Sequence, residues 1–221
     1  MTATPFDDFS TWARDLSISL SRAQSEKLAL FVTELWTWQG KMNLVGVSTQ
    51  DRLIRELLLD SLVPAPHIPR TGTLLDLGSG AGFPAIPLKI CMPRVRFDLL
   101  ESNARKAAFL NEMIRILELE RIRVIHARIE ESKKMLDPQG YGTITARAAA
   151  SLRQTLEWCG PHLERNGLLI SFQGKSWRKA LDQGHHVMKK QGLVLSRTLV
   201  YTLPGTSAER VILCFSKSGA P

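Results

Sequence analysis

The sequence has no long apolar run and no recognisable export signal. No stretch of the 221 residues approaches the roughly 18 consecutive apolar residues that a membrane-spanning helix needs. The first residues include Asp7 and Asp8, and no basic residue precedes an apolar run, which does not fit a secretory signal. We therefore expect a cytoplasmic protein that has no membrane partner.

Cysteines are few, and no metal-binding spacing is present. The three cysteines are odd in number, lie far apart in apolar surroundings and form no C-x-x-C pair: Cys91, Cys159 and Cys214. His185 and His186 have no third ligand at the spacing a metal site needs. We expect buried, reduced thiols and no bound metal.

Acidic residues are outnumbered by basic ones, at 21 Asp+Glu against 29 Lys+Arg, and the formal net charge is +8. The first 70 residues carry 7 basic and 8 acidic residues, whereas the rest carries 22 and 13. The positive field therefore belongs to the C-terminal two-thirds. Such a charge favours a polyanionic partner such as nucleic acid, although a basic surface that binds only water fits the charge equally well.

The first third of the chain has a helical pattern. Apolar residues from Leu28 to Trp38 recur at spacings of three and four, as on one buried helix face. A turn-rich stretch then runs from Pro64 to Gly72, where the composition changes. We predict a helical N-terminal segment over residues 1–70 and a second domain over residues 71–221.

Beyond residue 70, short apolar runs alternate with helical patterns, which predicts an α/β fold with a mostly parallel sheet. The last two apolar runs are joined by Leu203-Pro204-Gly205 and predict an antiparallel hairpin at the C-terminus. The predicted strands cover residues 73–77, 96–100, 124–126, 143–146, 168–172, 194–201 and 210–215.

A glycine-rich loop follows the first predicted strand. The segment reads D-x-G-x-G-x-G, with Asp76, Gly78, Gly80 and Gly82, and Phe83 stands where a dinucleotide-binding loop would have its third glycine. Glycines allow a sharp turn and a close approach of the backbone to a ligand at the start of the next helix. This form resembles the first motif of Rossmann-like methyltransferases, which implies S-adenosylmethionine as the cofactor.

Two further strand ends carry candidate contacts. Glu101 ends the second predicted strand, about twenty residues beyond the glycines, where a carboxylate can accept hydrogen bonds from a ribose. By the same geometry Ile129 and Glu130, just after the third strand, are placed to flank an adenine, and a plain solvent-facing turn is the alternative there.

Several segments together resemble the glucose-inhibited division protein B family. They are Asn43-Leu44, Arg55 with Leu59-Asp60-Ser61-Leu62, the loop from Gly78 to Leu88 with Pro84 and Pro87, and Thr145-Ala146-Arg147-Ala148 with Ala150-Ser151-Leu152. The resemblance implies methyl transfer to N7 of a guanine in 16S ribosomal RNA, with that RNA or the small ribosomal subunit as partner. Where the family commonly has a histidine, this chain has Glu56, and where it usually has Lys-Gly, this chain has Gln173-Gly174-Lys175.

The same resemblance implies roles for individual residues. Cofactor contacts are implied at Gly78, Phe83, Glu101, Ile129, Glu130 and Arg147, and basic or polar RNA contacts at Asn43, Arg128, Lys175 and Arg210. Guanine N7 carries an exposed lone pair, so no general base is expected, and Arg147 is expected to position the cofactor. The alternatives are a methyltransferase of the same fold that acts on a small molecule or a protein, and a nucleic-acid-binding module that has lost catalysis.

Overall fold

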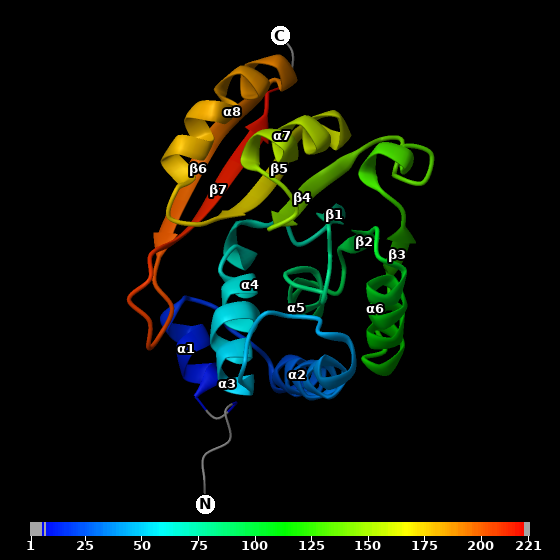
Figure 1. Cartoon of the computed structure of the whole chain (residues 1–221), viewed down its shortest axis with the longest axis vertical. Helices are drawn as coiled ribbons and strands as arrows, with labels where there is room; N and C mark the ends of the chain where they lie inside the picture. Colours follow the sequence, from blue (N-terminus) through cyan, green and yellow to red (C-terminus); the bar gives the residue numbers. More distant parts are fainter. Residues whose placement is uncertain (1–5, 7, 219–221) are drawn as a thin grey trace, which may run out of the picture.

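In a computed structural model, which describes residues 6 and 8–218, seven strands of the described chain form one twisted sheet (Figure 1). The strand order is β3-β2-β1-β4-β5-β7-β6, and the first five strands are parallel. The strands are β1 Thr73–Leu77, β2 Arg96–Glu101, β3 Ile122–His126, β4 Tyr141–Arg147, β5 Leu163–Gln173, β6 Leu193–Tyr201 and β7 Arg210–Lys217. The prediction of a mostly parallel α/β sheet is confirmed.

The C-terminal hairpin is also confirmed, and its place in the sheet adds a detail. Strand β7 pairs antiparallel with both β5 and β6, so the last strand of the chain lies inside the sheet and β6 is the outermost strand. As a result the start of β7, at Arg210, lies at the same edge of the sheet as the end of β5, at Gln173. That edge is also where β1, β2 and β4 end.

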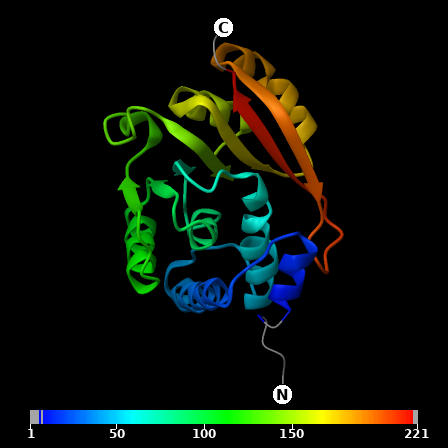
Figure 2. The same ribbon diagram turned by 180° about the vertical axis from the view of Figure 1, so that it is seen from behind.

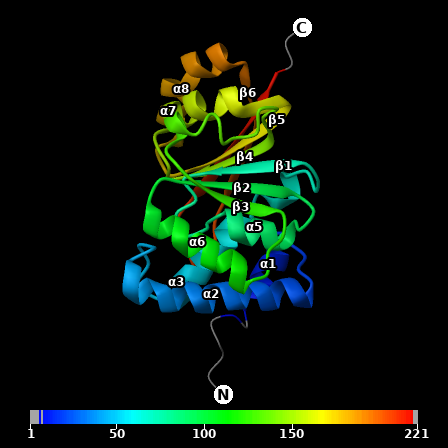
Figure 3. The same cartoon turned by 90° about the vertical axis from the view of Figure 1, so that its right-hand side faces the viewer.

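Helices cover both faces of the sheet, as the edge-on view in Figure 3 shows. One face is covered by α7 and α8, and the other by α5 and α6, with α2 forming a further layer beyond them. The helices of this domain are α5 Ala85–Cys91, α6 Ala104–Ile116, α7 Leu152–Cys159 and α8 Trp177–Gln191, with 3₁₀ turns η3 Ile129–Glu131 and η4 Gly160–His162. Two buried apolar clusters lie on the two sides of the sheet.

The N-terminal segment is helical, as predicted. Its long helix α2 begins with a capping box, in which the Ser21 hydroxyl accepts from the Gln24 N–H and the Gln24 side chain accepts from the Ser21 N–H. After it, Thr49 caps a short helix that continues into a turn of π-helix. The elements are α1 Phe9–Asp15, α2 Arg22–Met42, α3 Gln50–Leu53, η1 Ile54–Leu59, α4 Asp60–Leu62 and η2 Ala65–His67.

The apolar core is continuous across residue 70. Phe31 of α2 makes an edge-to-face contact with Phe83 of the glycine loop, with the ring centres 5.3 Å apart. Trp38 of α2 makes a similar contact with Phe109 of α6, with the ring centres 6.0 Å apart. The loop between β6 and β7 also lies beside α1 in both Figure 1 and Figure 2, and Gly205 of that loop approaches the Arg55 guanidinium. The helical segment is thus packed on the sheet domain from two sides.

Among residues 6 and 8–218, no helix is both long and apolar enough to cross a membrane. The three cysteines are free and buried, and burial raises the pKa of the Cys91 thiol to about 12. In that same part of the chain, no cluster of three His, Cys, Asp or Glu side chains is arranged to hold a metal ion.

Candidate cofactor and substrate site

The glycine loop between β1 and α5 turns sharply because three of its residues have positive φ. Gly78, Gly80 and Gly82 have φ values of +72°, +56° and +89°, a region that residues with a Cβ rarely adopt. The N–H groups of Gly78 and Ser79 both donate to the carbonyl of Leu100, at 2.9 and 3.1 Å, which fixes the loop against the end of β2. A Cβ on Gly78 would lie 3.1 Å from that of Ala149, so the backbone is closely approached there.

Glu101, the last residue of β2, lies directly beside this loop. One carboxylate oxygen accepts from the Gly80 N–H and the other from the Asn103 N–H, both at 2.7 Å. The side chain is held in one orientation by these two bonds, and each oxygen keeps a further lone pair. This carboxylate is therefore positioned and able to accept hydroxyl hydrogen bonds from a ribose.

Asp76 lies beneath the loop and is almost completely buried, with 1% of its surface exposed. One carboxylate oxygen accepts from the Thr145 hydroxyl at 2.6 Å, whereas Oδ2 has no hydrogen-bond partner in the described chain. Burial raises the pKa of Asp76 to about 6, against the opposing effect of the Thr145 hydrogen bond. A buried carboxylate oxygen without a donor is a feature that a bound cationic or donor group would satisfy.

A cavity of about 220 Å³ opens at the ends of β1, β2 and β3. Its lining includes Gly78, Ala149, Arg128, Ile129 and Glu130. Ile129 is buried at the start of η3, while Arg128 and Glu130 are exposed at the rim. Leu100 and Ser102, the two neighbours of Glu101 in the sequence, also line the cavity. An apolar wall and glycine backbone next to a positioned carboxylate fit a nucleoside cofactor, and we name this space the cofactor cavity.

Two predicted cofactor residues lie to the side of that cavity. Phe83 is 7% exposed and packs against Phe31. Arg147 ends β4 and directs its guanidinium to the N-terminal segment, where it lies 3.0 Å from Asp60. Direct contact of these two side chains with the cofactor stays a prediction.

The predicted RNA residues are spread over the molecule. Arg210 approaches Asp60 at 3.4 Å and Glu56 at 3.7 Å, close to Arg147. Lys175 is exposed in the loop after β5. Asn43 caps the C-terminus of α2 in the left-handed conformation, with φ of +48°, and asparagine tolerates that conformation better than most residues do. Their contacts with RNA stay predictions.

Sequence reasoning assigned no role to Asp60 or Tyr201, which the structure places at the centre of a polar cluster. Asp60 is 2% exposed, and its Oδ1 accepts from the Tyr201 hydroxyl at 2.7 Å while Oδ2 pairs with Arg147. A carboxylate within the apolar run Leu57-Leu58-Leu59-Asp60 was a usable signal for a buried ion pair. Nothing in the local sequence points to Tyr201.

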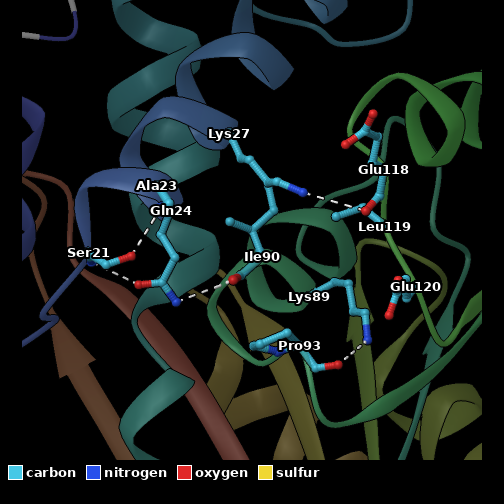
Figure 4. A pocket seen from close by; sticks show the side chains of 10 residues that line it. All are labelled: Ser21, Ala23, Gln24, Lys27, Lys89, Ile90, Pro93, Glu118, Leu119 and Glu120. Carbon is cyan, nitrogen blue, oxygen red and sulfur yellow. Dashed lines mark hydrogen bonds between the residues drawn. The ribbon is translucent and has the colours of Figure 1, made fainter.

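A larger cavity, of about 570 Å³, lies at the opposite edge of the sheet, between the start of α2, the end of α5 and the turn after α6 (Figure 4). Its donors bind main-chain carbonyls: Gln24 donates to Ile90, Lys27 donates to Leu117 at 2.7 Å, and Lys89 donates to Pro93 at 3.0 Å. Burial lowers the pKa of Lys89 to about 8. Gln24 and Lys27 thus cap the C-terminal ends of α5 and α6 and attach α2 to the sheet domain.

A seven-stranded sheet of this order, with a glycine loop after its first strand and a positioned carboxylate at the end of the second, defines the class of Rossmann-like methyltransferases. Solved structures share the fold: a methyltransferase from Pyrococcus furiosus superposes with a TM-score of 0.61 at 14% identity, covering 88% of this chain and 100% of that one. TYW2 of M. jannaschii in complex with AdoMet gives 0.59 at 13% identity, with coverages of 78% and 77%.

Sequence comparison gives the family. The GidB family, described as rRNA small subunit methyltransferase G, matches residues 24–206. The Ribosomal RNA small subunit methyltransferase G of Lachnoclostridium phytofermentans is 32% identical over 92% of this chain and 86% of its own length. The chain belongs to the rRNA small subunit methyltransferase G family, and the resemblance seen in the sequence motifs is confirmed.

Proposed function

We propose that this protein transfers the methyl group of S-adenosylmethionine to N7 of a guanine in small-subunit ribosomal RNA. The observation that carries the proposal is the cradle formed by Gly78, Gly80 and Glu101 in a chain of this family. The name of the relatives supplies the substrate class, and the family resemblance of the sequence supplies the guanine N7.

Three groups of the chain would hold the cofactor. Glu101 would accept hydrogen bonds from the ribose hydroxyls of the cofactor. The loop from Gly78 to Gly82 would lie against the main body of the cofactor, and Ile129 with Glu130 would flank the adenine. The buried Oδ2 of Asp76 supports a donor group above it. When bound, S-adenosylmethionine supplies an electrophilic methyl group on a positively charged sulfur.

The choice of guanine N7 explains why no general base is needed. N7 attacks through a lone pair and loses no proton, so catalysis rests on orientation of the two reacting atoms. Such a guanine has to be accessible, because the major groove of an RNA helix is too deep and narrow for side chains to read. Exposed cations such as Arg128 and Lys175 would add phosphate contacts. The methyl transfer to ribosomal RNA would take place in the cytoplasm.

The experiment is methyl transfer from radiolabelled S-adenosylmethionine to small-subunit RNA, offered naked and as intact subunits. We expect label in the RNA that maps to a guanine N7, and none with Gly80→Asp. That variant brings a second carboxylate next to Glu101, whose oxygen accepts from the Gly80 N–H.

The same assay separates the competing functions. If the wild-type protein binds S-adenosylmethionine but labels no form of the RNA, a small molecule or a protein becomes the substrate. If it binds no S-adenosylmethionine at all, the methyltransferase function is wrong.

A further inference from the structure

A second cavity, of about 300 Å³, lies on the other side of the loop that follows β4. Ala149 of this loop lines the cofactor cavity, whereas its neighbours Ala148 and Ala150 line the second one. The three-residue wall places the two spaces next to each other. A group in the second cavity would therefore be adjacent to a ligand that rests on Gly78 and Ala149.

The second cavity joins parts of the chain that are distant in sequence. Its lining comes from the ends of β4, β5 and β6, the start of β7 and the N-terminal segment, and includes Arg147, Phe172, Gln173, Tyr201, Arg210 and Asp60. Its volume is at the lower end of the range for small-ligand sites. One planar base fits this size class better than an extended ligand does.

The terminal nitrogens of the two arginines in this cavity are committed to acceptors of the N-terminal segment. Nη1 of Arg147 donates to the Leu57 carbonyl and the Ser61 hydroxyl, and Nη2 donates to the Glu56 carbonyl and forms an ion pair with Asp60 at 3.0 Å. The terminal nitrogens of Arg210 are directed at Glu56 and Asp60 as well, whereas its Nε has no hydrogen-bond partner in the described chain. Both guanidinium groups are thereby fixed against the N-terminal segment.

This commitment matters for a guanine. An unengaged arginine binds guanine through O6 and N7, which occupies the N7 lone pair. Terminal guanidinium nitrogens that are engaged by Asp60 and main-chain carbonyls leave N7 free to react.

The remaining lining offers surfaces that suit a purine. Phe172 provides an aromatic face, with the Arg147 guanidinium 5.5 Å from its ring centre. Aromatic side chains stack on extruded bases. Gln173 uses its amide nitrogen to donate to the Ser171 hydroxyl at 2.8 Å, which leaves its oxygen as an acceptor for the N–H groups of a guanine edge.

We propose that this cavity receives the target guanine of the methyl transfer, an inference that rests on the proposed function. The base stacks in the cavity with N7 directed at the wall formed by Ala148, Ala149 and Ala150, and Asp60 keeps the terminal nitrogens of Arg147 and Arg210 away from N7. The N7–carbon bond forms as the carbon–sulfur bond breaks. The electron pair of the broken carbon–sulfur bond stays on sulfur, and no proton moves.

The test fills one cavity at a time. Ala150→Leu and Gly174→Leu add volume to the second cavity from two different loops, and a Cβ at Gly174 meets no atom within 4 Å. Ala149→Leu is the matched variant for the cofactor cavity. Ala23→Leu, at the cavity of Figure 4 on the opposite edge of the sheet, is the control for added surface bulk.

Two properties are measured for each variant: the Kd for S-adenosylhomocysteine by calorimetry, and kcat/KM for RNA methylation. We expect Ala150→Leu and Gly174→Leu to keep the wild-type Kd within about threefold but to lose on the order of 100-fold in kcat/KM, because the base is displaced from the methyl group. Ala149→Leu loses the ligand itself, and Ala23→Leu changes neither value. Wild-type methylation by both cavity-filling variants would overturn the proposal.

A titration with guanosine 5′-monophosphate keeps this inference separate from the proposed function. It is added to the protein saturated with S-adenosylhomocysteine, and binding is followed by saturation-transfer NMR. Binding to the wild type that is lost in Ala150→Leu supports the base pocket even if no RNA is labelled, a result that contradicts only the RNA substrate. No binding to the wild type, together with undiminished methylation by Ala150→Leu, rejects the pocket alone.

Discussion

The carboxylate of Asp60 lies 3.0 Å from the guanidinium of Arg147, although the first belongs to the N-terminal helical segment and the second ends a central strand of the sheet. The same carboxylate accepts a hydrogen bond from Tyr201 and pairs with Arg210. One buried side chain therefore connects three strand ends to the helical segment. A ligand pocket built on these strand ends depends on that segment.

Replacing Asp60 should destabilise the fold strongly. Asp60→Asn leaves Arg147 with an uncompensated buried charge, and breaking such a pair costs about 3 kcal/mol in the free energy of unfolding. Tyr201→Phe, which removes one hydrogen bond to the same carboxylate and keeps the charge, should cost about 1 kcal/mol. Urea unfolding of both variants measures the difference, and equal midpoints would show that the ion pair adds nothing.

Replacing Glu101 should weaken cofactor binding. In Glu101→Gln the amide group turns a donor toward either the Gly80 or the Asn103 N–H, both of which now donate to the carboxylate. Loss of one charge-assisted hydrogen bond corresponds to about 10- to 100-fold in Kd. Calorimetry with S-adenosylhomocysteine measures this, with Glu118→Gln at the opposite edge as control. An unchanged Kd would remove Glu101 from the cofactor cradle.

Asp76 should make the ligand-free protein less stable at neutral pH. Its pKa is raised by burial from 3.8 to about 6, so the folded state binds the proton more tightly than the unfolded state does. The contribution of this group to stability is therefore greatest below about pH 4 and falls as the pH rises to 6. Above that value the full cost of a buried charge remains.

Asp76→Asn removes this cost while keeping an acceptor for the Thr145 hydroxyl. We expect the variant to exceed the wild type by on the order of 2 kcal/mol in unfolding free energy at pH 7, and to match it near pH 4. Urea titrations at the two pH values give the comparison. A variant that is less stable than the wild type at pH 7 would contradict the assignment.

Methylation of RNA should fall steeply with salt. If Arg128 and Lys175 each contact one phosphate, replacing either by Gln should reduce the slope of log affinity against log salt by about one. Arg22→Gln, which removes an exposed cation paired with Glu26, is the charge-matched control and should leave the slope unchanged. A slope that all three variants share with the wild type would place the RNA elsewhere.

The features that depend on local chemistry could be predicted from the amino-acid sequence. Alternating strands and helices gave the parallel sheet, and the spacing of Gly78, Gly80 and Gly82 predicted the turn because only glycine adopts those φ values readily. The position of Glu101 beside that turn could be predicted as well, because the ends of neighbouring parallel strands meet at one edge of the sheet.

The contacts between distant segments, in contrast, became visible in the folded chain. The Tyr201 hydroxyl reaches Asp60 across 141 positions of sequence, and the apolar core runs through the predicted boundary at residue 70. Ala149 and Ala150 are neighbours of the same residue type, yet they line different cavities. Such facts depend on packing between elements, which neither the spacing of residues nor their type encodes locally.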